Sequence, residues 1–98
     1  MVTEHAVLDV KAGQEAAFEA AFAEALPLIA SSPGFVSLRL ARGHEVPGRY
    51  LLLVEWATLE AHTEGFRGSP AYSRWRDLLH HFYDPFPTVE HFEVVASA

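Results

Sequence analysis

The sequence contains no cysteine, which excludes disulfide bonds, thiolate catalysis and cysteine-ligated metal sites. Long apolar runs are also absent: the longest aliphatic stretch is residues 51–54, whereas a membrane-spanning helix needs about 20 residues. The first residues, MVTEHAVLDV, include no basic region and predict no signal peptide. We therefore expect a cytoplasmic protein that does not enter a membrane.

Positive charge is scarce. Seven Lys and Arg residues stand against 13 Asp and Glu residues, and the formal net charge is −6. The basic residues are scattered along the chain and form no stripe, so the sequence predicts no nucleic-acid partner.

Hydrophobic side chains are abundant: they make up 50% of the 98 residues, and aromatic residues make up 12%. The length predicts one domain spanning residues 1–98. A chain of this size buries only about 60–65% of its unfolded surface. The excess of apolar side chains therefore favours an oligomer.

The hydrophobic periodicity predicts four strands and two helical regions. Alternation indicates strands at residues 3–10, 35–42, 50–56 and 88–96, with Val36, Leu38 and Leu40 sharing one face of the second. Helical spacing indicates a helix at residues 14–30, with a kink or loosened turn at Pro27. A second helical region begins with an N-cap at Thr58 and restarts at Ser69.

The order β-α-β-β-α-β is typical of the ferredoxin-like α+β fold, a four-stranded antiparallel sheet with its helices on one face. The third strand is apolar on both faces, and the helices can cover only one of them. We therefore expect a second copy of the chain to cover the other face, sheet against sheet, in a homodimer.

Over residues 2–95 the chain resembles the antibiotic biosynthesis monooxygenase family of dimeric α+β barrel proteins. The resemblance depends on the segments KAGQEAAFEAAF, SSPGFVSLRL, YLLLVEWATLEAH and FRGSPAYSRW, in this order and spacing. It implies the ferredoxin-like fold and one of several activities. Some members oxidise quinols or phenols with O2 and no cofactor, some cleave heme, and some have no assigned activity.

The resemblance disfavours heme cleavage for this chain. Trp56 matches the tryptophan of the heme-degrading branch, but His5 lies near its asparagine position and Arg76 near its iron-ligating histidine. His80 lies one helical turn later. The cofactor-free branch draws on a tryptophan and a tyrosine, which Trp56 and Tyr72 match.

Three residues are candidates for catalysis, and each has a structural alternative. Trp56 forms either a core contact or a pocket wall whose indole N–H orients a substrate. Tyr72 is either an interfacial core residue or a proton donor. His5 is either a half-exposed residue on a sheet face or a base, alone or with His91 on the neighbouring strand. The expected substrate-binding residues are Phe22, His62, Phe66, Trp75 and His91.

No metal site is predicted. His80 and His81 are adjacent on a helix and point about 100° apart, so they do not converge on one ion, and the end of this helix is expected to be solvated. His62 is expected to be solvated or to line a pocket mouth.

Two functions fit these observations. One is a cofactor-independent monooxygenase that oxidises a small aromatic, phenol or quinol substrate with O2, because such substrates can donate an electron to oxygen once deprotonated. The alternative is a non-catalytic dimeric protein of the same fold that binds a small ligand or acts in a stress response.

Overall fold

The computed structural model describes residues 1–98 and has the predicted order of elements. Its elements are β1 (Val2–Asp9), α1 (Glu15–Ala30), β2 (Phe35–Arg42), β3 (Arg49–Trp56), η1 (Ala61–Phe66), α2 (Pro70–Leu79), η2 (His80–Phe82) and β4 (Val89–Phe92). The segment η1 is a π-helical turn and η2 a 3₁₀ turn.

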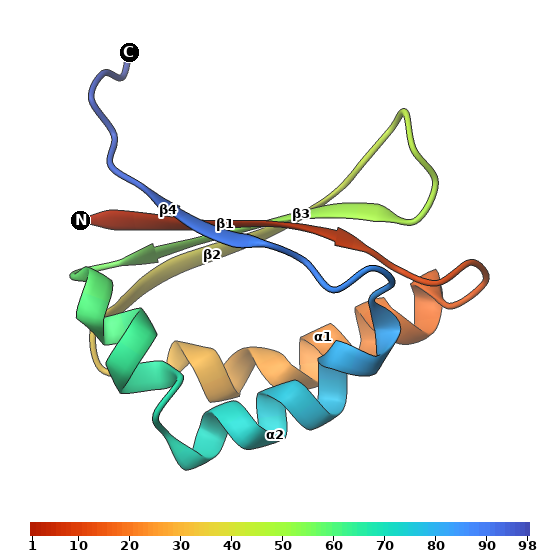
Figure 1. Ribbon diagram of the computed structural model, residues 1–98, viewed down its shortest axis with the longest axis horizontal. Helices are drawn as coiled ribbons and strands as arrows, with labels where there is room; N and C mark the ends of the chain where they lie inside the picture. Colours follow the sequence, from red (N-terminus) through yellow and green to blue (C-terminus); the bar gives the residue numbers. More distant parts are fainter.

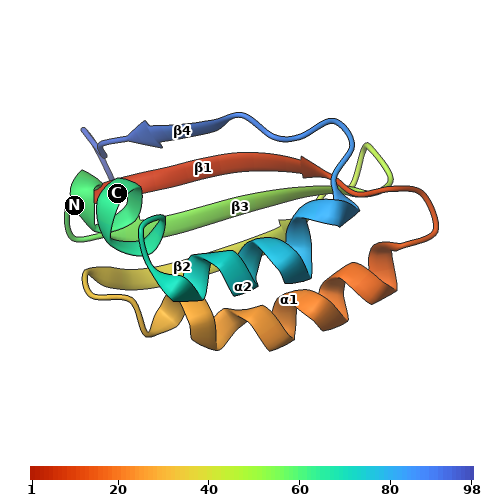
Figure 2. The same ribbon diagram turned by 60° about the horizontal axis from the view of Figure 1, so that its bottom comes forward.

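The four strands form one antiparallel sheet in the order β2-β3-β1-β4 (Figure 2). Both α helices cover the same face of this sheet, so the ferredoxin-like prediction is confirmed (Figure 1). No element covers the other face, which we call the outer face. The β2–β3 connection and the C-terminal segment both extend toward that outer side (Figure 1).

Strict alternation along β1 and β3 separates the two faces of the sheet. The inward side chains of β1, Ala6 and Leu8 among them, are buried, and those of β3 include the fully buried Trp56. The side chains between them point to the outer face. There Thr3 Oγ1 donates to Glu55 Oε1 at 2.6 Å, across the β1–β3 pair.

Two strands differ from the predictions. A register shift between Phe35 and Ser37 leaves Val36 50% exposed instead of facing inward with Leu38, while Phe35 packs edge-on against Trp56. The last strand ends at Phe92, not at residue 96. Because Phe92 pairs with Thr3, the chain has nearly passed the N-terminal end of β1 and has little left to pair with.

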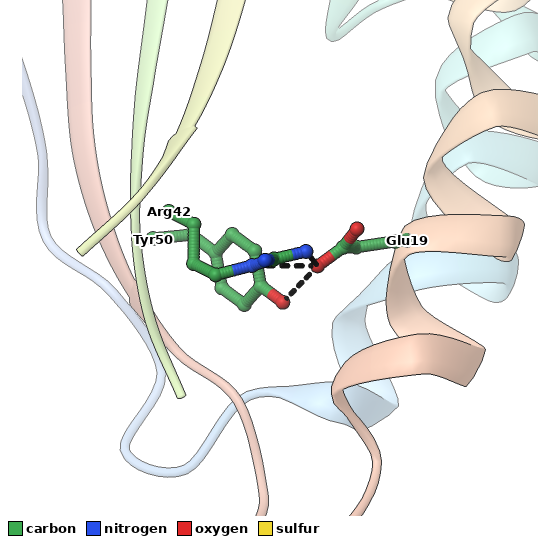
Figure 3. Close-up of polar contacts among 3 residues, drawn as sticks. All are labelled: Glu19, Arg42 and Tyr50. Atoms are coloured by element: carbon green, nitrogen blue, oxygen red, sulfur yellow. Dashed lines mark hydrogen bonds and ion pairs between the residues drawn. The ribbon is translucent and has the colours of Figure 1, made fainter. Parts of the chain in front are cut away.

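The helix α1 continues through Pro27 to Ala30. Proline removes one backbone donor, but the buried Phe18, Phe22 and Ile29 hold the helix against the sheet. A polar clamp adds to this packing (Figure 3). Glu19 Oε2 on α1 accepts hydrogen bonds from Tyr50 Oη and Arg42 Nη2, both at 2.6 Å.

The turn between α1 and β2 contacts the segment that follows β3. The carbonyl of Gly34 accepts a hydrogen bond from the backbone of Ala57 at 2.8 Å. Gly34 has a positive φ of 87°, and a Cβ placed there would lie 2.5 Å from the Cβ of Ala61. Only glycine allows this approach, which fixes where η1 begins.

Candidate functional site

A cavity of about 360 Å³ lies between the sheet and α2. Fifteen residues line it, and ten of them are hydrophobic. The inner faces of β1 and β3 form its floor, η1 and α2 form one wall, and the segment after α2 closes the other side. The lining residues are Glu4, Ala6, Leu8, Ile29, Leu52, His62, Phe66, Arg67, Tyr72, Trp75, His80, Tyr83, Phe86, Pro87 and Val89.

Buried polar side chains meet at one end of this cavity. Glu4 is only 6% exposed, and its Oε1 accepts a hydrogen bond from Trp56 Nε1 at 3.0 Å. His62 Nε2 lies 3.3 Å from the same oxygen. On its other side, His62 Nδ1 lies 2.8 Å from Nε2 of His91. The four side chains therefore form one connected network.

Three elements bring this network together. Register places Glu4 directly opposite His91 on β4, so the two side chains share the inner face. The Thr58 side chain accepts from the backbone N–H of Ala61 at 3.1 Å, so it caps the helical residues 59–60 that lead into η1, as predicted. The π-helical turn then places the His62 ring parallel to Trp56, with centroids 5.3 Å apart and planes at 17°. Such turns are often found at functional sites.

The ionisation properties follow from burial. Burial raises the pKa of Glu4 above its usual 4.5, and the hydrogen bond from Trp56 and the charge of Arg67 partly offset the rise. Burial, together with the charge of Arg67 and the neighbouring His91, lowers the pKa of His62 from 6.5 to about 3. His62 is therefore a neutral imidazole at physiological pH, with one donor and one acceptor nitrogen.

Other polar groups lie around the cavity. The hydroxyl of Tyr72 makes no hydrogen bond within the chain, and its ring packs edge-on against Phe66. Burial raises the pKa of Tyr83, so this phenol stays protonated. Burial also lowers the pKa of His80, with a further contribution from Arg76 that Asp77 opposes. Arg67 is an exposed cation at the edge of the cavity.

The structure brings together most of the residues expected from the sequence. Four of them line the cavity: His62, Phe66, Tyr72 and Trp75. Trp56 is fully buried and does not line it, but holds Glu4.

Two expected residues lie apart from the cavity. Phe22 packs behind Trp75, with ring centroids 5.5 Å apart. His5 lies on the outer face, where it pairs with Glu90 and packs against Phe92, and its Nδ1 is buried without a hydrogen bond. The hypothesised pairing of His5 with His91 does not occur, because the register aligns His91 with Glu4 on the opposite face.

Sequence reasoning missed the central residue, Glu4. The sequence did hold a sign of its role: Glu4 alternates with Ala6 and Leu8, so its carboxylate lies on the face of the strand that was expected to be buried. The expectation of a solvated helix end was wrong for His80, which is half-buried and lines the cavity because the chain continues as the η2 turn over the sheet. His62 is only 3% exposed, so the solvated alternative was wrong there too.

Arg76 lies on the exposed side of α2, where its Nε is 3.6 Å from Asp77. No cluster of three or more His, Asp or Glu side chains is arranged to hold a metal ion. None of the helices has the length and apolar character needed to span a membrane.

Comparison with known proteins agrees with this architecture. The sequence pattern of the antibiotic biosynthesis monooxygenase family matches residues 1–78. The uncharacterised protein YczJ of Bacillus subtilis is 55% identical over 95 residues, which cover 97% of this chain and 100% of YczJ.

Solved structures are similar as well. A Bordetella bronchiseptica protein assigned to the antibiotic biosynthesis monooxygenases is 37% identical, with a TM-score of 0.92 and 97% of each chain covered. A mutant of SnoaB, a cofactor-independent oxygenase of Streptomyces nogalater, is 26% identical with a TM-score of 0.77, covering 98% of this chain and 94% of its own. A mutant of MhuD with two manganese protoporphyrin IX molecules per active site has the same identity and TM-score, covering 100% and 98%. The chain belongs to the antibiotic biosynthesis monooxygenase family.

Proposed function

We propose that this protein is a cofactor-independent monooxygenase that oxidises a small phenol or quinol in the cavity between the sheet and α2. One observation carries the proposal: a buried carboxyl group, Glu4, opens onto an otherwise apolar and aromatic cavity. Flat aromatic rings fit such a lining, and a carboxyl group whose pKa is raised can accept a phenolic proton at neutral pH.

The chemistry needs no group beyond the substrate and O2. The phenol loses its proton to Glu4, and the phenolate transfers one electron to O2, which gives a phenoxyl radical and superoxide. The two combine at a ring carbon as a peroxide anion, which takes up one proton to become a hydroperoxide, balancing the proton lost by the phenol, and the hydroperoxide loses water to give a quinone. The sum is phenol plus O2 giving quinone plus water, so one oxygen atom enters the product and the substrate supplies all the electrons.

Two residues are placed to stabilise the negative charge of the anionic intermediates. Arg67 contributes positive potential at the edge of the cavity, since its charge acts on both Glu4 and His62. The hydroxyl of Tyr72 has no partner within the chain and is free to donate to a substrate oxygen. Both contributions favour the phenolate more than the neutral phenol.

The similarity to SnoaB, a cofactor-independent oxygenase, supports this function. The similarity to MhuD raises heme as an alternative ligand. Against heme cleavage, Arg76 is exposed on α2 and does not line the cavity, whose edge His80 occupies. Titration with hemin separates the two: no change in the hemin absorption spectrum is expected.

Oxygen uptake by the purified protein tests the function. With a panel of hydroquinones and naphthols, we expect the wild type to consume one O2 per substrate. Glu4→Gln should lose about a hundredfold or more in kcat/KM, in the range of a general base. Tyr72→Phe should lose about tenfold, and the exposed Glu60→Gln serves as a matched control with unchanged activity.

Two outcomes would contradict the assignment. Substrate analogues that bind, as judged by quenching of tryptophan fluorescence, without any oxygen uptake would favour the alternative of a ligand-binding protein. Turnover that survives Glu4→Gln unchanged would exclude the role given to the carboxyl group.

We further propose that the protein is a homodimer joined through the outer face. Leu51 and Leu53 of β3 and the exposed Phe92 of β4 lie on this face, and no helix covers them. A second sheet packed on it would bury these apolar side chains and also His5.

A further inference from the structure

A continuous series of close polar contacts leads from the cavity to the edge of the sheet. Oε1 of Glu4 lies 3.3 Å from Nε2 of His62, and Nδ1 of His62 is hydrogen-bonded to Nε2 of His91 at 2.8 Å. His91 lies on β4, the edge strand, and is half-buried. Its Nδ1 has no partner within the chain, so the series ends on the solvent side.

Two protonation states are compatible with these contacts. In the first, Glu4 is ionised, His62 donates to it from Nε2, and His91 donates from its own Nε2 to Nδ1 of His62. In the second, Glu4 carries a proton on Oε1 and donates to Nε2 of His62, while His62 donates from Nδ1 to Nε2 of His91. The first becomes the second when one proton shifts along each contact and Nδ1 of His91 takes up one proton from water.

We propose that Glu4, His62 and His91 form a proton relay that carries the hydroxyl proton of the substrate from the cavity to solvent at the β4 edge. The proposal rests on the proposed function and adds to it the route by which the proton leaves. His91 does not line the cavity, so its part is to pass on the proton and not to bind substrate.

The step balances from the second arrangement. The substrate hydroxyl gives its proton to Oε2 of Glu4, which has no hydrogen bond within the chain. Oε1 releases its proton to Nε2 of His62, Nδ1 of His62 releases one to Nε2 of His91, and Nδ1 of His91 releases one to water. The substrate is left as an anion, water gains the proton, and Glu4 and both histidines stay neutral.

The surroundings of His62 favour this concerted transfer. Burial and the charge of Arg67 disfavour an imidazolium at His62, so a proton that enters at one nitrogen must leave from the other. The stacking on Trp56 fixes the ring plane and keeps Nε2 near Glu4 and Nδ1 near His91. Burial raises the pKa of Glu4 and so favours the protonated carboxyl group from which the relay starts.

Binding of 4-nitrophenol tests the relay without any oxygen chemistry. Its phenolate absorbs visible light, so stopped-flow absorbance at a pH below its own pKa follows deprotonation on the protein. In the wild type we expect rapid phenolate formation. His91→Gln should reach the same amplitude about tenfold or more slowly, because the amide keeps a hydrogen bond to His62 but cannot pass a proton.

Two controls isolate proton transfer from packing. His81→Gln, at an exposed histidine outside the network, should leave the rate unchanged. Free imidazole should restore the rate in His91→Ala, where it takes the vacated place at the sheet edge, and a loss of packing alone would not respond in this way.

The outcomes separate the relay from the function. Equal phenolate rates in wild type and His91→Gln, or binding of 4-nitrophenol only as the neutral phenol, would overturn the relay. If the phenolate rates are equal, oxygen uptake by the wild type would still support the oxygenase function. Slow phenolate formation in His91→Gln, with no oxygen uptake on any substrate, would support the relay and remove the proposed reaction.

Discussion

Glu4 and Trp56 lie on neighbouring strands, and each supplies what the other needs in a dry interior. The indole N–H requires an acceptor when it is buried, and the carboxyl group requires a donor. Trp56 therefore acts on the cavity through Glu4 and His62 instead of lining it. The core alternative and the functional alternative for Trp56 are compatible, because the tryptophan is a buried support for a polar site.

The lowered pKa of His62 predicts an acid-dependent loss of stability. In the unfolded chain this imidazole gains a proton as the pH falls through about 6.5, but in the folded protein only near 3. The unfolded state therefore binds more protons than the folded state between these two pKa values. The contribution of neutral His62 to stability is fully present above the unfolded pKa, and it is lost as the pH falls toward the folded pKa.

Urea unfolding followed by tryptophan fluorescence between about pH 7.5 and pH 5 measures this slope, to which one proton contributes at most about 1.4 kcal/mol per pH unit. His62→Gln should flatten the slope, and His44→Gln, in the exposed β2–β3 connection, should keep it. An identical slope in all three proteins would mean that His62 binds protons equally in the folded and unfolded states and would contradict the lowered pKa.

At the scale of elements, periodicity predicted the helices and strands well because their burial is periodic. It also identified Phe66, Tyr72 and Trp75, since bulky apolar side chains on a helix that covers a sheet face the interior. The burial of Glu4 followed from the alternation of β1 and was overlooked. The pairing of His62 with His91 could not be predicted in this way, because it depends on register between β1 and β4 and on a π-helical turn, which a hydrophobic pattern does not encode.

The contact of Gly34 with η1 predicts that adding a single methyl group at this residue lowers the stability of the protein strongly. Gly34→Ala places a methyl group against Ala61 at a residue with positive φ, and should cost about 1–3 kcal/mol of unfolding free energy for the backbone plus a steric contribution. Gly13→Ala is the matched control, because Gly13 has a similar φ of 82° with no atom within 4 Å of the added Cβ.

Denaturant unfolding of both variants isolates the steric part. If the two glycine substitutions cost the same, the start of η1 is free to move away from β2, and the position of His62 is less constrained than the contact indicates.

At the scale of the whole molecule, the uncovered outer face predicts association. Light scattering at micromolar concentration should give twice the chain mass, because a stable sheet-to-sheet contact buries roughly 800 Å² per partner. Leu53→Arg introduces a charge at the centre of the outer face and should produce a monomer. Leu59→Arg, at a residue 40% exposed outside the sheet, should remain a dimer.

A wild-type monomer would contradict the interface and leave the apolar side chains of β3 exposed to water. The fold itself was predictable from the order of elements, because few arrangements bury an alternating sheet under two helices. For the outer face, the sequence predicted only that something must cover it. Side-chain alternation shows that a surface is apolar, but it does not show which element or partner packs against that surface.

The sheet is a single backbone layer, and this thinness has an evolutionary consequence. The backbone bonds that set the distance between Glu4 and Trp56 on one side also set the distance between Thr3 and Glu55 on the other. A substitution that changes strand spacing on the outer face is therefore transmitted to the carboxyl group inside. Substitutions on the outer face that change strand spacing are therefore expected to be constrained by the position of the buried carboxyl group.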